Sequence, residues 1–179
     1  MRERSLVSLA SGLLFLLLQG LVLLQAVPAR AEGEWREFRS DTDSFSVSLP
    51  ATPTISARRI GKSEATQTTF LIETPQTAYL VSVVEVPKGS GPKKPDAAYY
   101  QNLMKDYATG SKTTVRSTRM TTLAGRPAFQ AVTDAAEATH LVDLVAAGDR
   151  VFMVVYVGPK GQETRAEAVR LRDSFKILN

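Results

Sequence analysis

Four stretches with strand character follow one another between residues 112 and 157, and only short turns separate them. They are expected at 112–123, 127–135, 139–146 and 150–157. Links of hairpin length join antiparallel strands, whereas parallel strands need a longer crossover connection. Because residues 151–157 are apolar at every position, we expect them to form the most buried strand of an antiparallel sheet.

Further strands are predicted upstream, at 35–39, 44–49, 55–62, 66–73 and 78–86. In the second of these, Phe45, Val47 and Leu49 alternate with serines, which indicates one buried and one solvated face. The third and fourth are polar and flank Gly61, as expected of a hairpin. The fifth is rich in valine and apolar on both faces, which predicts a central strand.

Two segments have the periodicity of amphipathic helices. The first has Pro95 and Asp96 in its first turn, where both suit a helix, and Gly110 is expected to end it. Its apolar stripe consists of Tyr100, Leu103, Met104 and Tyr107. The second covers 162–173, with Arg165, Arg170 and Arg172 lying away from an inward face of Thr164, Ala168, Leu171 and Phe175. The expected fold is therefore α+β, a twisted antiparallel sheet of about eight strands with two amphipathic helices packed on it.

The first 31 residues have the parts of a secretory signal peptide. Arg2 and Arg4 precede an apolar stretch over 6–27, and Ala29 and Ala31 are the small residues that signal peptidase recognises. We therefore expect cleavage after Ala31 and an extracytoplasmic protein, either periplasmic or secreted. The alternative is a retained membrane anchor, since about 20 apolar residues span a bilayer.

Removing these 31 residues from the chain of 179 leaves 148, which is the size of one ordinary domain at 32–179. The remaining 19 cations and 17 anions give a charge of +2, which does not indicate nucleic-acid binding. The chain has no cysteine, which excludes disulfides, thiol catalysis and iron–sulfur clusters. The domain must be held together by its apolar core.

Several short patterns together resemble the PsbP-like and DcrB-like group of exported α/β/α sandwich domains. They are the aromatic opening of Trp35, Phe38 and Ser40, the strand and prolines at 45–53, the strand start at 125–128, the apolar strand at 151–157 and the closing helix and tail at 171–178. This resemblance implies a mostly non-enzymatic accessory or binding protein. The chain lacks a metal-ligand set like that of photosynthetic PsbP proteins, so we expect no photosystem role and no cofactor.

The chain's one histidine, His140, is the natural candidate for a catalytic base. A Ser-His-Asp set needs a carboxylate that orients the imidazole. Asp143 lies three positions away on the same predicted strand and so points to the opposite face, whereas Asp134 could face His140 across a hairpin. No nucleophile elbow accompanies them. We therefore expect a strand histidine, and a hydrolase using His140 is the remote alternative.

Other polar groups have simpler interpretations. Asp41 and Asp43 are expected to form a turn and not a calcium site. Lys112, Arg116 and Arg119 are expected to protect a sheet edge. The tyrosines at 99, 100 and 107 fit a helix core better than a ligand groove.

Two basic clusters remain as possible contact surfaces. Lys88, Lys93 and Lys94 lie in a Gly- and Pro-rich loop that the sequence predicts to be mobile, and Arg58, Arg59 and Lys62 form the second cluster. Both are of the kind that can touch anionic lipid headgroups, although solubility alone explains such charges.

Function is predicted only in outline. We expect a non-enzymatic domain of the cell envelope that binds an envelope protein or a small ligand. No nucleic acid is expected as a partner, and contact with a membrane is expected only if the N-terminal helix is retained.

Overall fold

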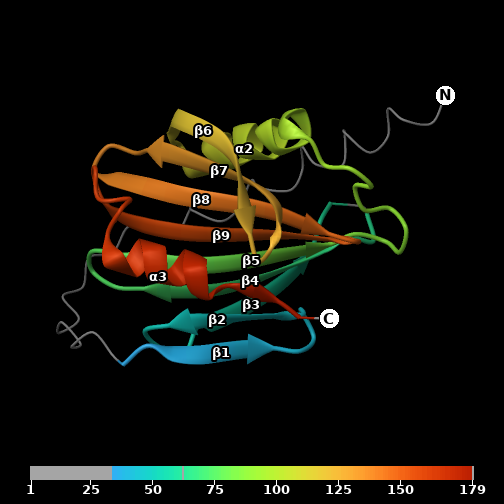
Figure 1. Cartoon of the computed structure of the whole chain (residues 1–179), viewed down its shortest axis with the longest axis horizontal. Helices are drawn as coiled ribbons and strands as arrows, with labels where there is room; N and C mark the ends of the chain where they lie inside the picture. The colour runs from blue at the N-terminus through green and yellow to red at the C-terminus, as the bar shows by residue number, and fades with distance from the viewer. Residues whose placement is uncertain (1–33, 62, 179) are drawn as a thin grey trace.

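The computed structural model describes residues 34–61 and 63–178, which form two antiparallel sheets and two helices (Figure 1). In chain order the elements are β1 (Arg36–Ser40), β2 (Phe45–Leu49), β3 (Thr54–Arg59), β4 (Thr66–Glu73), β5 (Ala78–Glu85), α2 (Ala97–Ser111), β6 (Thr114–Leu123), β7 (Arg126–Asp134), β8 (Ala138–Ala147), β9 (Arg150–Pro159), α3 (Ala166–Ser174) and β10 (Lys176–Ile177). The predicted α+β class is confirmed. The predicted signal segment, with Ala29 and Ala31, lies outside the described residues. Within them, no helix is both long and apolar enough to cross a membrane.

The larger sheet has seven strands in the order β3-β4-β5-β9-β8-β7-β6, and every neighbouring pair is antiparallel. Most neighbours are sequential hairpins, as the short links predict. The β6–β7 turn has positive φ at both Ala124 and Gly125, a geometry that matches the twist of the flanking strands. The predictions that 78–86 lies inside the sheet and that 151–157 is deeply buried are confirmed by β5 and by the central strand β9.

The smaller sheet has the order β1-β2-β10, so the predicted single sheet is divided in two. β2 pairs with β1 through a local hairpin and with β10 from the far end of the chain, where Lys176 lies opposite Ser46. Because β2 is the middle strand and α3 packs over it, Ser46 is buried as well as the apolar residues. The predicted alternation between a buried and a solvated face is therefore incomplete.

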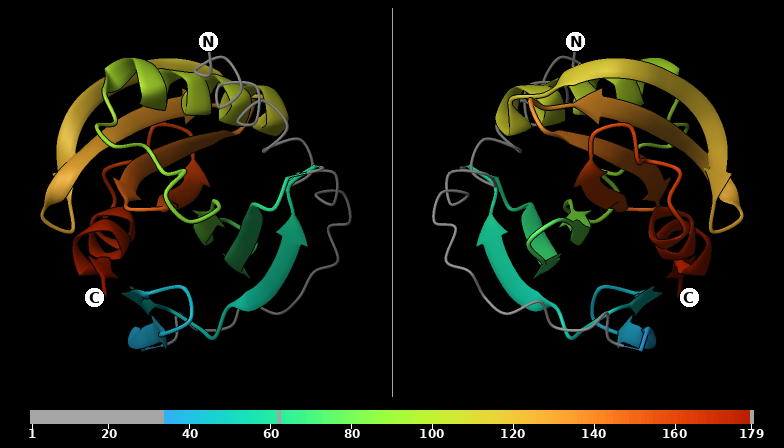
Figure 2. Two further views of the ribbon diagram at one scale, coloured as in Figure 1. Left: turned by 90° about the vertical axis from the view of Figure 1, so that its right-hand side faces the viewer. Right: turned by 90° about the vertical axis from the view of Figure 1, so that its left-hand side faces the viewer.

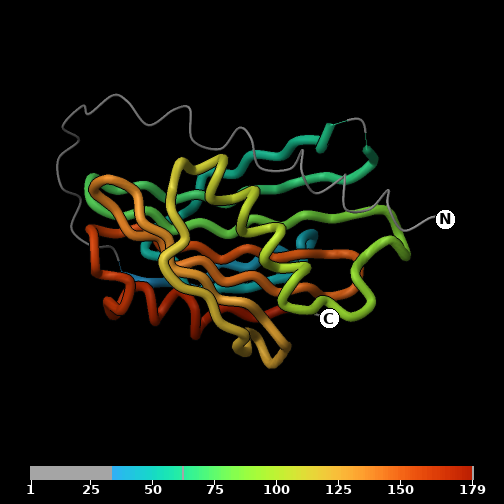
Figure 3. The backbone as a smooth tube through the Cα atoms, turned by 90° about the horizontal axis from the view of Figure 1, so that it is seen from above, coloured from blue at the N-terminus to red at the C-terminus, as the bar shows by residue number. Residues whose placement is uncertain are grey.

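The large sheet has a different covering on each face (Figure 2). On one face α2 packs with the side chains of Phe129, Val142 and Val155. On the other face α3 and the small sheet enclose a second core around Phe45, Phe152 and Phe175. Seen from above, the chain leaves α2 and enters the β6–β7 hairpin directly (Figure 3). This connection places one flank of α2 beside the last strand of the sheet.

Both helices differ from prediction at one end. α2 begins as expected, because the Asp96 side chain accepts a hydrogen bond from Tyr99 N at 2.8 Å. It continues past Gly110, however, and ends where Lys112 adopts a left-handed conformation at φ 54°. α3 begins only at Ala166, so Thr164 lies before the helix and is exposed instead of inward-facing. Ala168, Leu171 and Phe175 are buried as predicted.

Candidate functional site

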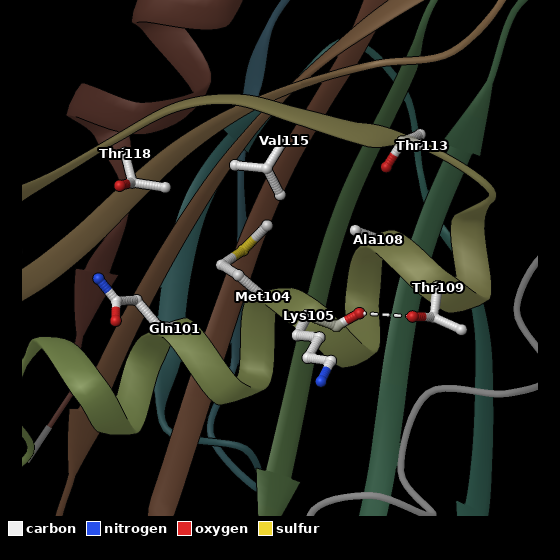
Figure 4. A pocket seen from close by; sticks show the side chains of 8 residues that line it. All are labelled: Gln101, Met104, Lys105, Ala108, Thr109, Thr113, Val115 and Thr118. Carbon is white, nitrogen blue, oxygen red and sulfur yellow. Dashed lines mark hydrogen bonds between the residues drawn. The ribbon is translucent and has the colours of Figure 1, made fainter.

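A groove of about 420 Å³ lies between one flank of α2 and the edge strand β6 (Figure 4). The side chains of Met104 and Val115 point toward each other across it. The α2 wall adds Gln101, Lys105, Ala108 and Thr109, and the β6 side adds Thr113 and Thr118. The lining is thus a short apolar floor with polar and cationic margins. The sequence patterns did not predict this groove.

A β-bulge in β6 decides which side chains face the groove. Val115 pairs with Thr133 and Ser117 pairs with Val132, so one residue of β6 is inserted between them. The insertion shifts the alternation by one position. Val115, Thr118 and Met120 therefore share the α2 side of the strand. Val115 is 39% exposed and Met120 is 46% exposed, so two of the large exposed apolar side chains of the described residues lie on this one strand.

The opposite side of β6 is cationic. Arg116 forms ion pairs with Asp134 and Glu163, with Arg116 Nε 3.3 Å from Asp134 Oδ2. Arg119 Nε donates to Gln130 Oε1 at 2.9 Å. In the described part of the chain β6 is the last strand of its sheet, and residues 114–120 are all exposed. The placement of Arg116 and Arg119 at a sheet edge is therefore confirmed, whereas Lys112 lies before β6 and caps the end of α2.

A buried ionic network lies under α3, and the sequence patterns did not indicate it. The Asp143 carboxylate is 1% exposed and accepts from Gln130 Nε2 at 3.0 Å and from Arg172 Nε at 3.3 Å. Arg172 also donates to Thr122 O at 2.7 Å. Burial raises the pKa of Asp143, although the positive charge of Arg172 and the Gln130 hydrogen bond oppose this effect. Arg172 was predicted to point away from the core, and instead it joins α3 to the sheet.

His140 is buried beneath α2, with 4% of its surface exposed. Its Nδ1 lies 2.7 Å from the Tyr107 hydroxyl. Burial lowers the pKa of His140 against the smaller opposing effect of Asp134, and burial raises the pKa of Tyr107, so both side chains are neutral near pH 7. Asp143 lies on the other face of the sheet, as predicted, and Asp134 accepts from Thr139 at 2.8 Å. His140 therefore has a phenol as its neighbour and no carboxylate that would orient it as a base.

The tyrosines of α2 belong mainly to the core, as predicted. The ring of Tyr100 stacks on Phe129 with 5.9 Å between centroids, and its hydroxyl accepts from Ala146 N at 3.1 Å. Tyr99 is only partly buried, and burial raises the pKa of its hydroxyl to about 12. The groove beside α2 is lined by other residues of this helix and by no tyrosine.

The basic loop before α2 is anchored, which corrects the prediction of a mobile segment. The Asp149 carboxylate accepts from Gly89 N and Gly91 N, each at 2.9 Å. Gly91 approaches the Gly148 carbonyl so closely that a Cβ atom would lie 2.0 Å from its oxygen. Lys88, Lys93 and Lys94 are nevertheless all exposed, so their role as a contact surface stays a prediction.

The remaining candidates have structural roles. Asp43 exchanges hydrogen bonds with Ser40, and Asp41 accepts from Arg39, as a turn requires. Arg58 donates to Gln67 along the other sheet edge. Among residues 34–61 and 63–178, no three His, Asp or Glu side chains gather in a way that could hold a metal ion.

Comparisons with known proteins identify a fold. No protein-family model matches the chain, and no curated protein does. The solution structure of a cyanobacterial PsbP (CyanoP) from Synechocystis sp. PCC 6803 superimposes with a TM-score of 0.59 and 9% sequence identity, over 86% of this chain and 98% of that one. A crystal structure from Bacteroides thetaiotaomicron aligns with a TM-score of 0.46 and 12% identity, over 83% of this chain and 49% of its own.

The match to CyanoP extends over nearly the full length of both chains. It agrees with the resemblance that the sequence patterns indicate. At 9% identity it establishes architecture alone, and on that evidence this chain has the PsbP-like fold.

Proposed function

We propose that this chain is an extracytoplasmic, non-enzymatic binding domain that holds another envelope protein in the groove between α2 and β6. The observation that carries the proposal is the exposure of Val115 and Met120 on the groove side of β6. Apolar side chains gathered beside a concave surface are typical of an interaction site. The signal-like sequence at 1–31 supports a location outside the cytoplasm.

The shape of the groove favours a protein over a small molecule. Small-molecule sites enclose most of the ligand surface. This groove is bounded by α2 on one side and by β6 on the other, and it is open to solvent instead of enclosed (Figure 4). Its lining supplies a Lys105 ammonium, amide and hydroxyl groups, but no enclosed cluster of polar groups that would orient a small ligand.

The burial of His140 supports a non-enzymatic role. A base must reach the proton that it removes, and this imidazole lies under a helix against Tyr107. The candidate base and the buried carboxylate are also separated, because Asp143 pairs with Arg172 of α3 on the opposite face of the sheet from His140.

Site-specific crosslinking in cells tests the groove. A photo-crosslinking amino acid is placed at Thr118 in the groove, at Ser56 on the opposite sheet edge, or at Lys94 in the basic loop. We expect a discrete crosslinked species from Thr118 alone. That species should be lost in Met120→Asp and kept in Ile55→Asp, a matched change because Ile55 is 55% exposed on β3. Crosslinks from Ser56 or Lys94 without one from Thr118 would contradict the proposal.

A further inference from the structure

We propose that the groove between α2 and β6 binds an extended peptide segment, which pairs with the free edge of β6 as an additional strand. This inference rests on the proposed groove function. The side chains of the peptide alternate between apolar residues toward the groove and acidic residues toward the cationic side of β6. Backbone pairing supplies the affinity and the alternating side chains supply the specificity, as in other cases of strand addition.

The backbone of β6 has the first property that strand addition requires. In the described part of the chain, β6 pairs with β7 on one side and with no strand on the other. The unpaired side of an edge strand carries N–H and C=O groups that accept a further strand. The exposure of every residue over 114–120 means that neither α2 nor α3 covers this edge.

The groove side of β6 selects apolar side chains. Because successive side chains of a strand point to opposite faces, every second residue of an added strand would lie on the α2 side. There it would lie beside Val115, Thr118 and Met120, which the bulge brings to one face. Cross-strand apolar pairs of this kind stabilise a sheet and remove exposed apolar surface from water.

The other side of β6 selects carboxylates. The segment 112–126 contains four cations and no Asp or Glu. Two of the cations, Arg116 and Arg119, lie on the face away from the groove, and Arg119 donates to an amide oxygen instead of a carboxylate. Arg116 keeps 43% of its side chain exposed despite its two acidic partners. The intervening residues of an added strand would therefore meet positive charge.

The same charges argue against a second copy of this chain as the occupant. Two paired β6 strands would bring together two segments that each carry Arg116 and Arg119 and have no carboxylate between residues 112 and 126. Like charges that meet across a pair of strands destabilise the pair. Cationic side chains on an edge thus discourage self-pairing while they attract an acidic strand.

Peptide binding to the folded domain tests the proposal. The probe is a fluorescent peptide of about six residues with alternating valine and glutamate, a length typical of one strand. Its first control has the same composition in two blocks, three valines and then three glutamates. We expect the alternating peptide to bind at least about tenfold more tightly, and to weaken as salt is raised. Equal affinity for the two peptides would show that the groove does not select a strand with alternating apolar and acidic side chains.

Backbone methylation separates strand addition from simple filling of the groove. Two further peptides carry N-methyl groups on every second residue, in one register or the other. In an added strand only one set of N–H groups faces β6, so one register should abolish binding and the other should not. Met120→Asp should weaken binding of the unmethylated peptide, and Ile55→Asp should leave it unchanged. If both registers bind equally while Met120→Asp still weakens binding, the groove function stands and strand addition is wrong. If neither register nor Met120→Asp has any effect, the groove is not the binding site.

Discussion

The buried carboxylate of Asp143 depends on one cation and one amide. Arg172 reaches it from α3 and Gln130 reaches it from the neighbouring strand, while Arg119 donates in turn to Gln130. A buried ion pair of this kind adds little net stability over an apolar pair, but it is costly to break. Arg172 therefore adds an ionic link between α3 and the sheet to the apolar packing of Ala168 and Leu171.

Arg172→Met should reduce the free energy of unfolding by about 3–5 kcal/mol, because it leaves the Asp143 charge buried without its cation. The double variant Arg172→Met, Asp143→Leu should recover most of that loss. Urea denaturation measures both. Arg170→Met serves as the control, since Arg170 lies over the Trp35 ring at 4.9 Å on the surface and should contribute under about 1 kcal/mol. Additive losses in the double variant would contradict the ionic account.

His140 should make stability depend on pH. Its pKa in the folded chain is lowered by burial, so the unfolded chain binds the proton more readily. Stability is therefore complete above the ordinary histidine pKa of about 6.5 and falls as the pH drops below it. His140→Gln should flatten this dependence between about pH 7 and pH 5, where one proton accounts for up to about 1.4 kcal/mol per pH unit. Tyr107→Phe should lower stability by about 1 kcal/mol but keep the slope. Equal slopes for wild type and His140→Gln would show that the proton binds elsewhere.

Single residues differ in how far the sequence predicts them. The period of two in a strand is enough to separate His140 from Asp143, since three positions along a strand reverse the face. It says nothing about Arg172, because an arginine outside an apolar stripe still has a stem long enough to reach a buried partner. The face to which Val115 points could not be predicted either, because the residue inserted at the bulge reverses the face of every later side chain on the strand.

Among the elements, the loop between β5 and α2 is held by one residue, Asp149 of the β8–β9 turn. The Asp149 carboxylate accepts hydrogen bonds from two backbone N–H groups of the loop, and the Asp149 carbonyl accepts one from Val86 N at 2.9 Å. The hydrogen bonds from Gly89 N and Gly91 N and the charge of Lys88 lower the pKa of the Asp149 carboxyl. The loop is thus attached to a hairpin that lies about 60 residues further along the chain.

Asp149→Ala should release this loop. We expect faster amide hydrogen exchange over 87–95, measured by mass spectrometry, with little change in β4 or β9, because the hydrogen bonds lost are local. In the wild type the attachment should persist at pH values below the ordinary aspartate pKa of about 3.9, and it should be lost only as the pH falls through the lowered pKa of Asp149. Asp173→Ala removes an exposed carboxylate elsewhere and should leave exchange in the loop unchanged. Slow exchange in Asp149→Ala would mean that other contacts hold the loop.

The strands were easier to predict than the helix ends. Alternation and short turns are local signals, and most strand boundaries agree within two residues. The end of α2 was not predicted, because Lys112 takes a left-handed conformation that usually favours glycine. The Lys112 N–H donates to Thr109 O, and Thr113 N donates to Ala108 O at 2.9 Å. These hydrogen bonds satisfy the last carbonyl groups of α2, so the helix ends here without a glycine.

At the scale of the whole molecule, the two sheets share one apolar core. Phe45 of β2 lies 4.9 Å from Phe70 of β4 between ring centroids, and 5.9 Å from Phe175 beyond α3. The division into two sheets could not be predicted from the sequence. It depends on β10, whose two residues carry no strand pattern of their own and pair with β2 only in the assembled fold.

Export makes a prediction for the chain as a whole. If the first 31 residues are a cleaved signal peptide, the protein isolated from outside the cytoplasm should begin at Glu32, as measured by mass spectrometry of the intact chain. Replacing both Ala29 and Ala31 with large residues should leave the uncleaved form on the membrane, while the same change at Ala51 should not. An exported protein that still begins at Met1 would instead support a retained anchor.

The small sheet also has a consequence for the order of folding. β2 is synthesised early, but its partners lie far along the chain. Phe45 of β2 packs against Phe175, and the backbone of β2 pairs with β10. Ser48 N also donates to Ser174 Oγ, which is 126 residues away in the sequence. Contacts this distant in sequence form slowly, because the intervening chain must close first. The segment 174–177 therefore completes the small sheet at a late step, and we expect β1 and β2 to remain incompletely folded until that segment has been synthesised.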